Sequence, residues 1–258
     1  DSATNRNITA ALSLSELDTS MPKLSADRTP LDSRGIGSAL FGFQNMTLGR
    51  VGGQQMRLCL SALADHIEAS NLSINAQALG NSFYGLQGMS SDNEVVQRIL
   101  CALTNKVDKM PSLQEGGLEY ELSGQNIGNA LWGFRNMSAE SVEVRAALRS
   151  IARKIKISTA KMNGQNIGNA LYSLHAMDPR HQEVRDVLSA IAIKLMNTQH
   201  VLSGLDIGMA LYGLRNMDST VAEVRVILGL LVYRIRATPS SELALQHGDL
   251  ALAVVGLL

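Results

Sequence analysis

Apolar residues recur along the chain at the spacing of amphipathic helices. One stripe occupies positions i, i+3, i+4, i+7 and i+10, at Ile127, Ala130, Leu131, Phe134 and Met137. A second stripe follows at Val144, Leu148, Ile151 and Ile155. Both patterns bring apolar side chains to one face of a helix, and no segment alternates as a half-buried strand would. The sequence therefore predicts an all-α protein built from pairs of helices.

The helix pair recurs as an internal repeat. The segments 122–137, 162–177 and 202–217 nearly superimpose, and related segments lie at 33–46 and 76–89. An apolar anchor marks each unit, at Ile36, Leu79, Ile127, Ile167, Ile207 and Leu250. These anchors are separated by 43, 48, 40, 40 and 43 residues. One amphipathic pair cannot bury its own stripe but a stack of pairs can, which predicts a right-handed α-solenoid of about five to six helix-hairpin repeats of roughly 40 residues.

The repeat also sets the expected domain organisation. A degenerate N-terminal helix and loop are expected at 1–32, followed by the repeat array at 33–258. The units are placed at 33–71, 72–121, 122–161, 162–201 and 202–242, with a partial unit at 243–258. The longest spacing contains residues 110–121, where Pro and Gly residues predict a loop insertion.

Two local features refine the helix pair. Glycines at one register, Gly42, Gly85, Gly133 and Gly213, are predicted to lie within the first helices. Glycine there costs roughly 1 kcal/mol against alanine, so its recurrence indicates that neighbouring first helices approach closely. Asp178 and Pro179 are predicted to begin a second helix, as its N-cap and first helical residue.

Charge and composition narrow the range of possible functions. The net charge is zero, which argues against a generic, strongly electrostatic nucleic-acid binder. The charge is uneven, however, since residues 122–237 carry 14 basic and 8 acidic side chains, a net of +6. No apolar run approaches the about 20 residues that span a bilayer. We therefore expect a soluble protein without a transmembrane segment, while association with a membrane surface stays open.

No residue pattern indicates catalysis or a metal site. Ser158 and Lys161 match an SxxK spacing, but the companion motifs of that enzyme class are missing. Residues 49–53 contain three glycines without the Gly-Lys-Ser/Thr of a phosphate loop. Cys59 and Cys101 form no metal-ligand spacing, and no two histidines are four residues apart. We therefore expect a protein that is not an enzyme and has no catalytic, cofactor-binding or metal-binding residues and no cofactor.

An aromatic ladder is the sharpest candidate for binding. Phe41, Tyr84, Trp132, Tyr172 and Tyr212 share one repeat position, with Asn three residues earlier and Arg or His three later in several units. Such a stripe could stack on bases, or it could pack against the adjacent repeat. Basic residues of the second helices add a row that suits an anionic partner. The candidate contacts with a partner or RNA are Asn129, Trp132, Arg135, Asn169, Tyr172, His175, Tyr212, Arg215, Arg145, Arg149, Arg185 and Arg225.

The first-helix segments resemble those of a known repeat family. The stretches SGQNIGNALWGF, at 123–134, and NGQNIGNALYSL, at 163–174, are similar to the first helix of octotricopeptide-type repeats, which are related to those near RAP domains and in FAST-kinase-like proteins. The resemblance covers roughly residues 33–258. It implies an α-solenoid located in an organelle, a chloroplast or mitochondrion, and usually acting on RNA.

Two functions remain open at this point. The neutral charge and the uniform ladder positions favour a protein-protein scaffold, as an accessory or assembly subunit of a larger, organellar complex. A code that assigned one base to each repeat would need variation at those positions. The alternative, supported by the resemblance and the basic block, is an octotricopeptide-like protein that binds organellar transcripts or rRNA.

Overall fold

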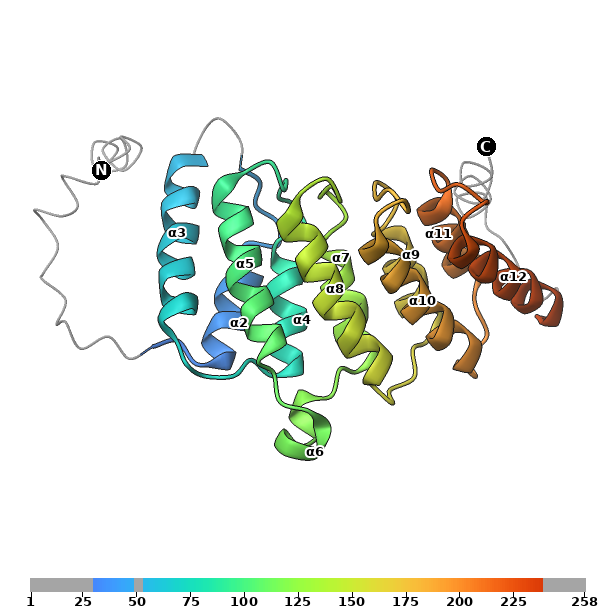
Figure 1. Cartoon of the computed structure of the whole chain (residues 1–258), viewed down its shortest axis with the longest axis horizontal. Coiled ribbons are helices and arrows are strands. Elements are labelled where there is room, and N and C mark those ends of the chain that lie inside the picture. Colours follow the sequence, from blue (N-terminus) through green and yellow to red (C-terminus); the bar gives the residue numbers. More distant parts are fainter. Residues whose placement is uncertain (1–29, 49–52, 239–258) are drawn as a thin grey trace, which may run out of the picture.

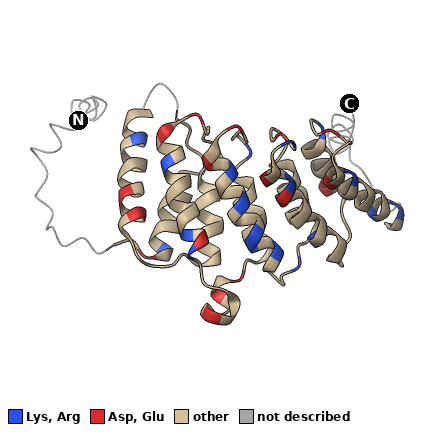
Figure 2. Cartoon of the chain, viewed as in Figure 1, with Lys and Arg blue, Asp and Glu red and all other residues tan. Residues whose placement is uncertain are grey.

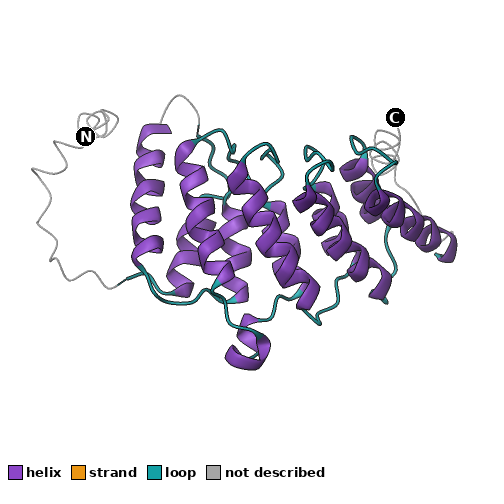
Figure 3. Cartoon of the chain, in the orientation of Figure 1, coloured by secondary structure: helices purple, strands orange, loops and turns teal. Residues whose placement is uncertain are grey.

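The computed structural model describes residues 30–48 and 53–238, and this part of the chain is all-α (Figure 3). Eleven α-helices and a short 3-10 helix, with no strand, occur within these residues. The first helices of the pairs are α2 (Ser33–Phe41), α4 (Ala76–Gly85), α7 (Gly124–Trp132), α9 (Gly164–Tyr172) and α11 (Gly204–Leu214). The second helices are α3 (Gly53–Ala69), α5 (Glu94–Asp108), α8 (Val142–Ile157), α10 (Gln182–Asn197) and α12 (Ala222–Ala237).

The helix pairs stack in sequence into two layers. Each first helix packs on the next first helix, from α2 through α4, α7 and α9 to α11. Each second helix likewise packs on the next, from α3 through α5, α8 and α10 to α12. The result is an elongated row of helix pairs in which the chain advances steadily from one end to the other (Figure 1). The predicted all-α fold and its sequential helix pairs are thus confirmed.

The predicted apolar stripes form the core between the layers. The anchors Ile127 and Ile167 and the second-helix residues Val144 and Ile151 are fully buried. The first helices are shorter than their stripe predicts, because α7 ends at Trp132 while the rest of the stripe continues through a turn. Phe134, in that turn, is nevertheless fully buried. The buried apolar residues therefore keep a helical spacing for one turn beyond the end of the helix.

Side-chain caps fix where the first helices begin. The Ser123 hydroxyl accepts a hydrogen bond from the backbone N–H of Asn126, whose own side-chain oxygen accepts from the N–H of Ser123 (3.1 and 3.0 Å). The same reciprocal capping box recurs at Asn163 in α9 and at Ser203 in α11. These bonds satisfy N–H groups that lack partners inside the helix.

The recurring glycines are explained by close backbone contact. A Cβ atom on Gly133 would lie 2.0 Å from the carbonyl oxygen of Phe83, in the preceding first helix. Gly85 and Gly213 lie equally close to the preceding helix, and a Cβ on either would collide with a carbonyl oxygen. The predicted close approach is confirmed at these three positions. Gly85 and Gly213 lie in the last turn of α4 and α11, as predicted, whereas Gly133 is the C-cap residue that follows α7.

The start of α10 differs from the prediction. Asp178 and Pro179 lie in a turn, and the helix begins at Gln182 with His181 at the N-cap. The carboxylate of Asp178 accepts a hydrogen bond from the backbone N–H of Arg180 at 2.8 Å, which closes a turn ahead of the helix. The expectation of an Asp N-cap was therefore wrong, because the same Asp-Pro pair also suits a turn.

The predicted insertion contains α6 (Leu113–Gly116) and the 3-10 helix Leu118–Tyr120, which project from one end of the helix pairs (Figure 1). The expected N-terminal helix, the glycine-rich residues 49–52 and the partial unit at 243–258 lie outside the described residues.

Within the described part of the chain, none of the helices is both long and apolar enough to cross a membrane.

Candidate functional site

The aromatic ladder lies on the first-helix layer. Trp132 stacks on Tyr172 with ring centroids 5.3 Å apart, and Tyr172 stacks on Tyr212 at 5.1 Å. Phe41 and Tyr84 form a second stacked pair at 5.7 Å. A planar group inserted between two rings would need about 7 Å, twice the usual carbon contact distance. The facing sides of the rings within each run are therefore closed to an inserted planar group.

The ladder is interrupted between Tyr84 and Trp132, where no stacking contact joins these two described residues. The Trp132 indole N–H donates instead to Oε1 of Gln87, at 2.7 Å. This interruption coincides with the longest repeat spacing, of 48 residues. The sequence predicted one uniform ladder, whereas the structure contains two separate runs.

The basic side chains beside the ladder lie against its rings. The guanidinium of Arg135 is 5.0 Å from the Trp132 ring centroid, and that of Arg215 is 3.7 Å from the Tyr212 centroid. His175 lies beside both Tyr172 and Tyr212, with centroid distances of 5.4 and 5.9 Å. Cation–π contacts of this kind hold a guanidinium on a ring. The candidate residues of the first helices thus come together as one stripe.

Amide side chains form the polar margin of this stripe. Asn129 and Asn169 lie one turn before Trp132 and Tyr172 on α7 and α9 and are half-buried. Gln125 and Gln165, one turn earlier still, are exposed. These positions offer both donors and acceptors, since a carboxamide has two N–H groups and a carbonyl oxygen. The stripe therefore combines amides, ring edges and a few cations.

Arginines at one repeat position of the second helices form hydrogen bonds within their own repeat unit. Each donates from Nη1 to the carbonyl oxygens five and six residues earlier, in the turn between its two helices. The pairs are Arg145 with Ala139 (2.6 Å) and Glu140 (2.9 Å), Arg185 with Pro179 (2.9 Å) and Arg180 (2.7 Å), and Arg225 with Ser219 (3.2 Å) and Thr220. In α5, Gln97 replaces the arginine and donates to the carbonyl of Ser91 at 2.8 Å. The guanidinium at this position therefore closes a turn.

A second recurring cation joins consecutive units. Near the end of each second helix from α5 onward, a basic side chain donates to carbonyl oxygens at or beyond the end of the preceding second helix. The pairs are Lys106 with Ser70 and Leu72 (2.9 Å), Lys154 with Met110 (2.6 Å), Lys194 with Ser158 (2.5 Å) and Ala160 (3.0 Å), and Arg234 with Leu195 (3.0 Å), Met196 (3.1 Å) and Thr198 (2.6 Å). The carbonyls of Leu195 and Met196 belong to the last turn of α10, where carbonyls lack partners within the helix, and the others follow a helix end.

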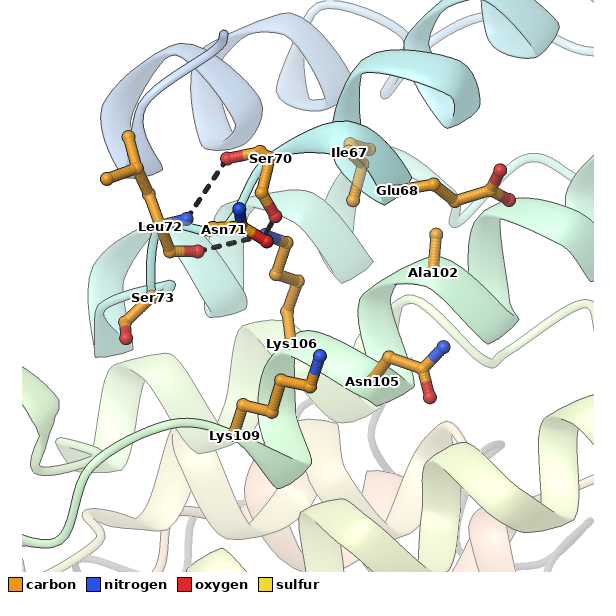
Figure 4. Close-up of a pocket in the computed structure, with 10 residues that line it drawn as sticks. All are labelled: Ile67, Glu68, Ser70, Asn71, Leu72, Ser73, Ala102, Asn105, Lys106 and Lys109. Atoms are coloured by element: carbon orange, nitrogen blue, oxygen red, sulfur yellow. Dashed lines mark hydrogen bonds between the residues drawn. The ribbon is translucent and has the colours of Figure 1, made fainter.

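Sequence reasoning missed this junction. The four cations are spaced by 48, 40 and 40 residues, as the anchors of their units are, and that spacing was the available signal. Burial lowers the pKa of the Lys106, Lys154 and Lys194 amines. Figure 4 shows the first junction, a cavity of about 160 Å³ in which Lys106 reaches the carbonyls of Ser70 and Leu72. Because that amine is already hydrogen-bonded, the cavity is a structural junction and a weak candidate for an anion site.

Ion pairs cross the seams between consecutive second helices. Lys and Arg follow the length of α8, with acidic residues on its neighbours (Figure 2). The pairs are Arg98 with Asp65 (2.6 Å) and Glu68 (2.5 Å), Arg153 with Asp108 (2.8 Å), Arg149 with Glu183, and Lys156 with Asp186 (3.5 Å). The candidate residue Arg149 is thus placed in a seam.

The residues around this stripe provide little evidence for a metal site or a reactive group. Within residues 30–48 and 53–238, no three His, Cys, Asp or Glu side chains are grouped as they would be to hold a metal ion. Cys59 and Cys101 are exposed, free thiols. No family model, curated protein or solved structure matches this chain.

Proposed function

We propose that this chain is a right-handed α-solenoid that acts as a non-catalytic protein-protein scaffold, an accessory or assembly subunit of a larger complex. The observation that carries the proposal is how the chain uses its basic residues. The positive charge of residues 122–237 suggests an anionic partner, yet most of these cations have partners within the chain.

Phosphate binding requires cations that are free to replace counterions. Arg145, Arg185 and Arg225 are bonded to turns, and Lys154, Lys194 and Arg234 to carbonyl oxygens of the preceding unit. Arg149, Arg153 and Lys156 are paired with carboxylates. An RNA would have to displace the carboxylates to gain the charge of Arg149, Arg153 and Lys156. The carbonyl bonds fix the direction of the other cations and occupy some of their donors.

Base stacking has the same difficulty on the ladder. Binding of single strands depends on open aromatic faces, whereas Tyr172 already stacks on both sides. The ladder and the second-helix arginines also lie on different helix layers. A protein partner, which can use ring edges, amides and apolar side chains, fits this surface better.

One observation favours RNA as a second candidate. Arg135, His175 and Arg215 lie in line beside Asn129 and Asn169, on the stripe that resembles octotricopeptide-type repeats. Amides and guanidiniums can bond base edges or phosphates. In this alternative, the chain binds organellar transcripts or rRNA.

The deciding experiment purifies the chain from its native source after nuclease treatment. The scaffold proposal predicts that a defined protein complex remains attached. The RNA alternative predicts instead that the purified chain binds an RNA of about 10–15 nucleotides at sub-micromolar concentration, with a steep loss at higher salt. Arg135→Gln with Arg215→Gln is the matched variant, since it removes the two guanidiniums that lie on the ladder rings. Fractionation of the same source tests the organellar location that the resemblance implies.

A further inference from the structure

The seam between α10 and α12 differs from the other second-helix seams. An apolar groove of about 380 Å³ lies between these two helices, and its walls include Ile193, Met196, Val226 and Leu230. Ile193, Met196 and Val226 are 41%, 59% and 52% exposed, high values for apolar side chains in regular helices. Between residues 182 and 237, no ion pair joins α10 to α12.

Comparison with the preceding repeat unit identifies the residues that cause this difference. One unit earlier, 40 residues before Ile193, Met196 and Val226, stand Arg153, Lys156 and Asp186. Lys156 and Asp186 form an ion pair across the α8–α10 seam at 3.5 Å. The fold therefore tolerates a charged seam at these positions, and burial of the core does not explain the apolar residues at α10–α12.

We propose that the α10–α12 groove binds one amphipathic helix of a protein partner. This inference rests on the proposed scaffold function and names the site and the kind of partner. The groove walls are side chains of two helices, whose backbone groups are bonded within the helices. An extended segment laid there would leave its own N–H and C=O groups without partners, whereas a helix satisfies them internally.

The dimensions agree with a single helix. The apolar row on α12 runs from Ala222 to Leu230, about 12 Å at the helical rise, or roughly two turns. A stable interface between two copies would engage about 20–30 residues on each side, many more than line this groove. The patch fits two to three turns of a partner helix with apolar residues three and four apart.

The C-terminal part of the chain is a less suitable occupant. Its apolar run at 251–258 carries the pattern of a first helix, with its anchor at Leu250. In each described unit after the first, the first helix packs on the preceding first helix, not in a groove between second helices. The groove is therefore expected to receive a different chain.

The first test places a photo-crosslinking amino acid, p-benzoylphenylalanine, at position 193 of the full chain in its native source. Crosslinks to another protein, at residues with helical apolar spacing, would support the proposal. Crosslinks to residues 239–258, to a second copy or to a non-helical segment would overturn it, as would the absence of any crosslink.

The second test copies the preceding seam into the groove. The double variant Met196→Lys with Val226→Asp introduces the Lys–Asp pair that α8 and α10 already accommodate, so it should fold. We expect about a tenfold loss of the co-purified protein. The control Ile157→Lys charges another exposed apolar side chain, at the end of α8, and should leave binding unchanged.

These outcomes separate the two proposals. A double variant that folds, as shown by circular dichroism, and keeps its complex overturns the groove and leaves the scaffold intact. A wild-type chain that carries no protein after nuclease treatment overturns both.

Discussion

The ammonium of Lys194 donates to the carbonyl oxygens of Ser158 and Ala160, 2.5 and 3.0 Å away, at the junction between two repeat units. The side chain is buried, and desolvation lowers the pKa of its amine. Lys194→Met should therefore reduce the free energy of unfolding by about 1.5–3 kcal/mol, the value of hydrogen bonds to a charged group. Urea unfolding followed by circular dichroism measures this loss.

Lys161→Met provides the matched control. Lys161 is exposed and donates only to Oε1 of Gln199, at 2.9 Å. A surface bond of this kind should change stability by less than about 0.5 kcal/mol. Equal effects of the two substitutions would contradict a structural role for the Lys194 junction.

Two helical glycines should respond oppositely to alanine. At Gly133, a Cβ would meet the Phe83 carbonyl at 2.0 Å, and neither backbone can move freely. Gly133→Ala should destabilise the chain by about 1–3 kcal/mol or more, as overpacking does. At Gly229, in α12, a Cβ meets nothing within 4 Å. Gly229→Ala should stabilise the chain by about 0.5–1 kcal/mol because alanine is the better helix former.

Paired unfolding curves of the two alanine variants and the parent chain check this contrast. A Gly133→Ala variant as stable as the parent would show that the first helices do not need their close approach. The sign of the stability change caused by Gly229→Ala tests helix propensity alone, since no neighbouring side chain has to move.

Helix pairs could be predicted from the sequence because burial of one helix face gives the apolar residues a regular spacing. Ile127 and Val144 fall on apolar stripes, and each is fully buried. The start of α10 could not be predicted with the same rules. Asp178 is as suitable for closing a turn onto Arg180 as for capping a helix, and the residue types alone do not decide between the two.

The roles of the periodic cations were harder to predict than the fold. A basic residue repeated every 40 positions is typical both of a binding row and of a recurring internal bond. Arg145 and Lys194 form internal bonds because carbonyl oxygens lie within reach, and backbone positions are not encoded in a pattern of side chains. The apolar replacement at Met196, by contrast, can be recognised by aligning it with Lys156.

Asp178 should make stability depend on acidic pH. The side-chain hydrogen bond from Arg180, followed by the backbone bond from the same residue, lowers the pKa of this carboxyl from 3.8 to about 2. Since the folded chain binds the proton less tightly than the unfolded chain, the stabilisation is complete above about pH 4 and is lost as the pH falls towards 2. Asp178→Asn should remove this component of the pH dependence.

A carboxyl titration followed by NMR measures the pKa of Asp178 directly. Arg180→Ala should raise that pKa while leaving the turn bond to the backbone N–H in place. Asp218 offers an internal reference one unit later, where the backbone and side chain of Thr220 lower the carboxyl pKa without a guanidinium. An Asp178 midpoint that Arg180→Ala leaves unchanged would show that the guanidinium does not cause the shift.

Tyr172 should contribute more to stability than the ladder residue at the end of the row. It stacks on Trp132 and Tyr212, whereas Phe41 stacks on Tyr84 alone. With each aromatic pair contributing about 0.5–1.5 kcal/mol beyond burial, Tyr172→Ala should cost about 1–3 kcal/mol more than its lost area. Tyr172→Phe keeps both stacks and serves as the control. If the ring instead served mainly to bind a partner, Tyr172→Ala would weaken that binding and leave the unfolding curve almost unchanged.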